Sequence, residues 1–208
     1  MMNTKPHAFK SFIYGLAGKP FIPSRLLQQN QRLVIHVSDT PEEIHSFLVA
    51  LASKLRPVAI IHTGDVADNH KLEFQPGLLP HYRKAAERLI SALTVMCPGE
   101  LYITPGNHDH QETLSELLPG GVVKQGWLKI QGRWFYLTHN LEEIPHKPGY
   151  YCFGHKFDPP HHEADGVVLL NGLLSINVIN LETGEVDLLH YPLGTNGYRK
   201  MTESRVGL

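Results

Sequence analysis

The chain has 208 residues, a formal net charge of -1 and an ordinary share of apolar residues. A chain of this length can bury roughly 70% of its unfolded surface in one domain, so it needs no disulfide framework. The near-neutral charge argues against general nucleic-acid binding, which requires a basic excess or stripe. Cys97 and Cys152 are too few and too far apart for a disulfide framework or a cysteine-based zinc site.

The sequence carries no signal for a membrane or for secretion. No stretch approaches the ~20 apolar residues that a membrane span needs. The short apolar stretch near the N-terminus, at 12–17, is interrupted by Tyr14 and Gly15, so it does not form a signal-peptide core. We therefore expect a cytoplasmic protein that does not bind membranes.

The first half of the chain, after an irregular start, predicts alternating strands and helices. Residues 1–30 contain scattered proline and glycine without periodicity, which indicates an irregular N-terminal arm on the surface of the domain. Apolar runs and helical spacing then predict strands at 33–37, 58–61 and 101–103, with helices around 44–55 and 85–93 between them. This alternation is typical of a parallel sheet covered on both faces.

The second half predicts mainly strands, at 127–130, 134–138, 150–153, 167–170, 174–179 and 186–191. Turns at Gly132 and Thr183-Gly184 fit hairpins between neighbouring strands. We therefore expect an α/β sandwich of two mixed sheets flanked by helices, with a parallel half followed by a more antiparallel half. The domain should span 31–195 and be followed by a C-terminal tail at 196–208.

A residue suited to metal binding follows each of five predicted strands. These residues are Asp39, Asp65 in Gly-Asp-x-x-Asp, Asn107 in Gly-Asn-His-Asp, His139, and His155 in Gly-His. Loops at the carboxyl ends of parallel strands meet at one edge of a sheet, so we expect the five side chains to converge. Mixed oxygen and imidazole ligands favour a divalent transition metal such as Mn, Fe, Zn or Ni over calcium.

The order of these motifs resembles the calcineurin-like metallophosphoesterase family, from residue 33 to about 192. The resemblance implies hydrolysis of a phosphomonoester or phosphodiester by a metal-activated hydroxide, with a small phosphorylated molecule as the substrate. It implies that Asp65 bridges two metals, and that Asn107, His139 and His155 are the remaining ligands of the second metal.

The resemblance also assigns two catalytic residues within Gly-Asn-His-Asp. His108 matches the residue that contacts the phosphate and assists the leaving group. Asp109 matches the partner that orients this histidine. A purely structural metal site has no use for such a pair, so their presence favours an enzyme.

The ligands of the first metal depart from the family pattern. The family has Asp-x-His after the first strand and a second histidine two residues beyond Gly-His, where this chain has Pro41 and Phe157. Neither side chain binds a metal, so Asp39 and the shared carboxylate alone remain. We expect one tightly bound metal and a weak or absent second one. Thr40, Pro41 and Glu43 also match a capping sequence, which indicates that the loop is rebuilt as a helix start.

Several alternatives remain open. A nearby side chain could replace the lost ligands, the candidates being Glu42, His45, His36, His161 and His162. The chain could instead be a catalytically impaired binding or scaffold module on the same fold, or a phosphate sensor that uses the metal and Lys156. Asp68 is expected to accept a hydrogen bond behind the site, and His62 to be a core histidine.

Overall fold

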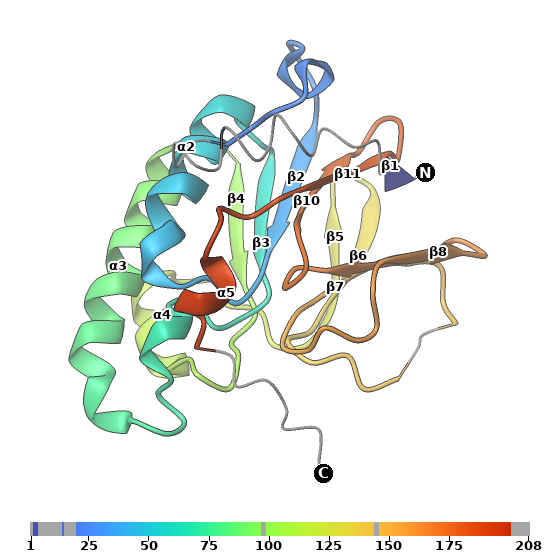
Figure 1. Cartoon of the computed structure of the whole chain (residues 1–208). Coiled ribbons are helices and arrows are strands. Elements are labelled where there is room, and N and C mark those ends of the chain that lie inside the picture. The colour runs from blue at the N-terminus through green and yellow to red at the C-terminus, as the bar shows by residue number, and fades with distance from the viewer. Residues whose placement is uncertain (1, 4–13, 15–19, 97–98, 144–145, 201–208) are drawn as a thin grey trace.

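The computed structural model describes residues 2–3, 14, 20–96, 99–143 and 146–200. Two mixed sheets pack face to face, and the long helices cover the outer face of the first sheet (Figure 1). The predicted α/β sandwich of two mixed sheets with flanking helices is therefore confirmed. The first sheet is covered on both faces as expected, by helices on one side and by the second sheet on the other.

The first sheet has six strands in the order β1-β11-β10-β2-β3-β4. These strands are β1 (Met2–Asn3), β2 (Leu33–Val37), β3 (Ala59–His62), β4 (Glu100–Ile103), β10 (Ile176–Asn180) and β11 (Val186–Leu189). Strands β2, β3 and β4 are parallel, as predicted. Strand β10 runs antiparallel to both β2 and β11, so the end of the chain returns to complete the first sheet.

The second sheet has five strands in the order β5-β6-β7-β9-β8. These strands are β5 (Gly126–Ile130), β6 (Arg133–Leu137), β7 (Gly149–Phe153), β8 (His162–Ala164) and β9 (Val167–Asn171). Its three central strands, β6, β7 and β9, are parallel, and only the edge strands are antiparallel to their neighbours. The expectation of a more antiparallel second half is therefore wrong for the centre of this sheet, because long connections return the chain to the start of the next parallel strand.

The helices are α2 (His45–Leu55), α3 (Leu79–Met96), α4 (Gln111–Leu117) and α5 (Thr195–Tyr198), with 3-10 turns η1 (Ser24–Leu27), η2 (Glu42–Ile44), η3 (Asp68–His70) and η4 (Pro76–Leu78).

Alternate residues of β2 face different cores, since side chains alternate along a strand. Ile35 and Val37 pack with the helices, whereas Val34 packs with the second sheet. Both faces of β2 are thus buried, which explains why all of its residues except His36 are apolar.

The predicted N-terminal arm does more than lie on the surface. Met2 and Asn3 pair in parallel with Val186 and Asp187, so they cover the free edge of the first sheet. Leu26 is buried in the helix-side core. The other residues before residue 20, apart from Tyr14, lie outside the described part of the chain.

The predicted C-terminal tail begins too early at residue 196. Arg199 is 1% exposed. Its guanidinium donates hydrogen bonds to the carbonyls of Asp39 (2.7 Å) and Leu173 (2.8 Å), and it lies 4.6 Å from the centre of the Tyr191 ring. Residues up to 200 are therefore part of the folded domain, and 201–208 lie outside the described residues.

Arg199→Ala should lower the free energy of unfolding by about 3 to 5 kcal/mol, because it leaves a cavity and several buried carbonyls without a donor. Urea denaturation measures this change. The control is Lys200→Ala, whose exposed side chain donates to the carbonyl of Asn69, and it should stay within about 0.5 kcal/mol of the parent. Equal stabilities for the two variants would mean that residues beyond 195 do behave as a tail.

Candidate metal centre

Four of the five expected ligands meet where the two sheets join. Asp65 and Asn107 follow β3 and β4 of the first sheet, and His139 and His155 follow β6 and β7 of the second. The Nε2 atom of His139 lies 3.4 Å from Asp65 Oδ2, 3.0 Å from Asn107 Oδ1 and 3.2 Å from His155 Nδ1. One ligand atom from each of Asp65, His139 and His155 lies within 4.8 Å of the other two.

The fifth expected ligand, Asp39, lies beside this cluster. Its Oδ2 atom accepts a hydrogen bond from the backbone N–H of His155 at 3.1 Å. Its own N–H donates to the carbonyl of Gly64 at 2.9 Å. Asp39 therefore links the loops after β2, β3 and β7 and remains close enough to contribute charge to the site.

The chemistry of the converging atoms fits a divalent cation. His139 Nδ1 lies 2.6 Å from the Thr63 carbonyl, which can only accept, so Nδ1 carries the hydrogen. The Nε2 lone pair of the neutral ring then faces the Asp65 carboxylate and the Asn107 amide oxygen. Three acceptors repel one another unless positive charge lies among them. A metal held by Asp65, Asn107, His139 and His155 supplies that charge.

The pKa values reflect the same demand for positive charge. Burial by itself lowers the pKa of His139, but the Asp65 carboxylate and the charge of Asp39 outweigh it and raise this pKa to about 10. Burial by itself raises the pKa of Asp65, but the hydrogen bond and charge of His139 lower it overall. Burial lowers the pKa of His155, so this ring is neutral at neutral pH, as a metal ligand must be.

Three of the expected ligands have a backbone conformation that non-glycine residues rarely adopt. Their φ angles are 51° for Asp39, 57° for Asp65 and 68° for His155. Such strain persists only where the surroundings impose it, and it is often found at functional sites. At Gly106, any Cβ atom would overlap the Asp65 carboxylate, so only glycine allows these loops to approach so closely.

The loop after β2 is not rebuilt in the predicted way. Thr40 does not cap the following turn; its hydroxyl donates to the Val66 carbonyl at 3.0 Å and contacts His62 Nε2 at 2.8 Å. Pro41 takes the N-cap position of η2, without a side-chain hydrogen bond. The reason is that the backbone N–H of Thr40 donates to the carbonyl of Asp65 at 2.9 Å, which draws the threonine to the neighbouring loop.

The side chains considered as replacement ligands have other partners or lie in exposed positions. His36 bonds Thr63 and Asn177, His45 bonds the Val66 carbonyl, His161 bonds Ser175, Glu42 pairs with Arg88, and His162 is exposed in β8. Within the described residues, the groups of three potential ligands include none of these five. The same contacts identify His36 as a buried core histidine, and the bond to Thr40 does so for His62.

Asp109 has a different position from the one expected. Its carboxylate accepts hydrogen bonds from the N–H groups of Asp65 (2.7 Å), Val66 (2.9 Å) and Gly106 (2.8 Å) and from the hydroxyl of Tyr82 (2.9 Å). These bonds tie the loops after β3 and β4 together, and within the described residues no hydrogen bond joins this carboxylate to the His108 ring. Burial and the charge of Asp65 raise the pKa of Asp109 to about 6.

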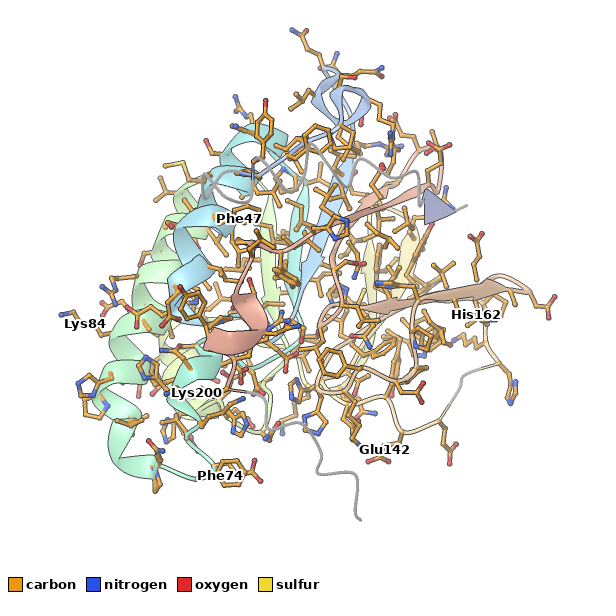
Figure 2. The ribbon with its side chains drawn as sticks, in the orientation of Figure 1. Phe47, Phe74, Lys84, Glu142, His162 and Lys200 are labelled. Atoms are coloured by element: carbon orange, nitrogen blue, oxygen red, sulfur yellow. The ribbon has the colours of Figure 1, made fainter. Side chains whose placement is uncertain are left out.

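His108 is buried beside the cluster. Its backbone N–H donates to Asp65 Oδ1 at 2.9 Å, which fixes the residue beside the ligands. Its ring Nδ1 lies 3.6 Å from Glu73 Oε2, and the ring centre lies 5.5 Å from that of Phe74. Phe74 is 71% exposed and projects from the edge of the molecule in Figure 2. Glu73 and Phe74 belong to no motif, so only the fold reveals their place at the site.

Two further polar residues near the site have structural partners. Asp68 accepts a hydrogen bond from Lys71 Nζ at 2.6 Å, and its carboxylate also forms a group of potential ligands with Asp65 and His108, whose ligand atoms lie within 4.8 Å of one another. Burial and the charges of Asp65 and Asp39 raise the pKa of Asp68 to about 7. His110 caps α4, where its ring accepts from the N–H of Thr113 at 3.3 Å.

Binding of Mn²⁺ to the metal-free protein at about pH 7.5 should release about one proton. With a pKa of about 10, the His139 ring is protonated before binding, and it must be neutral to bind a metal. Isothermal titration calorimetry in buffers of different ionisation enthalpy counts the protons. The variant His139→Ala should lose this release. A wild-type titration without proton release would contradict the assigned protonation of His139.

Comparisons with known proteins agree with the family resemblance of the sequence motifs. A family model described as calcineurin-like phosphoesterase matches residues 33–197. The structure aligns with YfcE, a phosphoesterase from E. coli, with a TM-score of 0.50 and 13% identity over 74% of this chain and 96% of YfcE. A second solved structure aligns with a TM-score of 0.53 and 10% identity over 78% of this chain and 99% of its own.

A Thermotoga maritima protein, TM1076, is 22% identical over 76% of this chain and 98% of its own, with a TM-score of 0.43. No curated protein matches the sequence significantly. In the part of the chain that the structure describes, no helix combines the length and apolar character needed to cross a bilayer. The family match covers most of the chain, and the protein therefore belongs to the calcineurin-like phosphoesterase family.

Proposed function

We propose that this protein is a phosphoesterase that works with one tightly held divalent metal. The observation that carries the proposal is the convergence of Asp65, Asn107, His139 and His155 on one point beside His108. Membership of the family supports metal-dependent phosphoric ester hydrolysis in general. When bound at this point, the metal supplies Lewis acidity towards a phosphoryl oxygen and activates water.

In this proposal the protein residues position the substrate and move a proton. His108 is 7% exposed and lies beside the cluster, where its ring can donate a proton to the leaving oxygen. A general acid of this kind contributes roughly 10²- to 10⁴-fold to the rate. Asp109 acts indirectly, by holding together the loops that follow β3 and β4. It accepts hydrogen bonds from the backbone N–H groups of Asp65 and Val66 in the first loop and of Gly106 in the second.

The single-metal feature rests on the two substituted positions. Pro41 is buried and carries no donor atom, and Phe157 is half exposed. Asp39 keeps its carboxylate near the cluster, so it is positioned to hold a second cation only weakly. A small phosphorylated substrate and a cytoplasmic location remain predictions from the sequence.

A second function, binding without turnover, is favoured by one observation. Phe157, Leu174 and Leu193 are each more than a third exposed and line one cavity of about 300 Å³. Phe157 is two residues from His155 in the sequence, and Arg199, which donates to the Asp39 carbonyl, lines the same cavity. Exposed apolar clusters frequently mark a surface that binds a partner or ligand.

His108→Ala should reduce Mn²⁺-stimulated hydrolysis of an aryl phosphomonoester or phosphodiester roughly 10²- to 10⁴-fold, because it removes the proton donor. Metal binding should persist, since the other four side chains hold the metal. His81→Ala, which changes an exposed histidine on α3, serves as the control. A protein that binds Mn²⁺ tightly and hydrolyses neither class of ester would point to the binding function.

Pro41→His combined with Phe157→His should raise the metal content from one toward two per chain, because it restores two imidazoles beside Asp39. Elemental analysis after dialysis against Mn²⁺ measures this ratio. Phe157→Ala controls for loss of the aromatic ring. An unchanged ratio would mean that the loop after β2 has moved too far to present a ligand.

A further inference from the structure

We propose that Glu73 is a positioning residue that sets the orientation of the Asn107 carboxamide and thereby the affinity for the metal. The proposal rests on the metal centre described above and adds a residue that no motif contains. The proposal concerns the orientation of a ligand before the metal binds. Its test therefore measures metal binding in the absence of a substrate.

The carboxamide of Asn107 has two chemically different ends, and only its oxygen can bind a cation. Oδ1 lies 3.0 Å from His139 Nε2, on the side of the converging ligands. Nδ2 donates a hydrogen bond to Glu73 Oε2 on the opposite side. A half-turn of the carboxamide would direct the NH₂ group at the metal position and the oxygen at the Glu73 carboxylate. Both contacts would be repulsive, so Glu73 selects the orientation that binds.

The surroundings leave this role to Glu73. Asp109, the carboxylate next in the motif, is occupied by three backbone N–H groups and the hydroxyl of Tyr82. The other neighbour of Asn107 Nδ2 is the His108 ring, whose nitrogens lie 3.2 and 3.3 Å away. An imidazole ring offers either a donor or an acceptor at a given nitrogen, so it distinguishes the two amide ends less strictly than a carboxylate does.

A short turn holds Glu73 in place. The N–H groups of Phe74 and Gln75 both donate to the carbonyl of Lys71 at 3.0 Å. The Lys71 side chain is in turn fixed by Asp68 at 2.6 Å. The same Glu73 oxygen lies 3.6 Å from His108 Nδ1, so one carboxylate contacts both a ligand and the proposed proton donor. The segment between η3 and η4 thereby becomes part of the site.

The test compares Mn²⁺ binding by isothermal titration calorimetry in metal-free wild type, Glu73→Ala, Glu73→Gln and Glu112→Ala. Glu73→Ala should weaken binding roughly 10- to 100-fold, as expected for loss of a partner that orients a ligand. Glu73→Gln should weaken binding less than Glu73→Ala does, because its amide can accept from Asn107 Nδ2 but can also turn and donate, which a carboxylate cannot. Glu112→Ala removes an exposed carboxylate next to His110 and should leave the affinity unchanged.

Two outcomes would overturn the proposal while leaving the metal centre intact. Wild-type affinity in Glu73→Ala would mean that Asn107 needs no orienting partner. Equal weakening in Glu73→Gln and Glu73→Ala would mean that negative charge alone matters. A wild-type protein that binds no Mn²⁺ would instead refute the metal centre itself. A wild-type protein that binds Mn²⁺ but hydrolyses no phosphoric ester would refute only the proposed activity.

Discussion

The structure depends on one unfavourable arrangement, in which acceptor atoms from two sheets face one another at a single point. Asp65 and Asn107 come from the first sheet, and His139 and His155 from the second. The hydrogen bond from His139 Nδ1 to the Thr63 carbonyl holds the ring so that its second nitrogen faces inward. Positive charge at this point satisfies all of these groups at once, which is why the raised pKa of His139 and the proposed metal share one cause.

A network of buried hydrogen bonds behind the ligands offsets the free-energy cost of this arrangement. Asp109 joins the loops after β3 and β4 and accepts from Tyr82 on α3. On the other side, Arg199 donates to the carbonyl of Asp39 and anchors the loop after β2. Tyr82 on α3 and Arg199 thus both hold loops in place. The backbone of these loops adopts a strained conformation at Asp39 and Asp65.

The loss of two ligands makes the site asymmetric. On the side of Asn107, the cluster has orienting contacts, a buried histidine beside it and the Glu73 segment. On the side of Asp39, Pro41 is buried and Phe157 joins an exposed apolar cluster. One side therefore presents converging polar ligand atoms, and the other presents an apolar surface.

The sequence by itself determined the buried strands, the long helices and the residues that follow the strands, because these depend on local periodicity and on motif spacing. The parallel centre of the second sheet, the hydrogen-bond partners of Asp109, and the positions of Glu73 and Arg199 were decided by the tertiary structure alone. Each of these depends on contacts between segments distant in the chain, such as Arg199 with Asp39. A polar side chain can bond any of several partners, and the tertiary structure decides which of them lie within its reach.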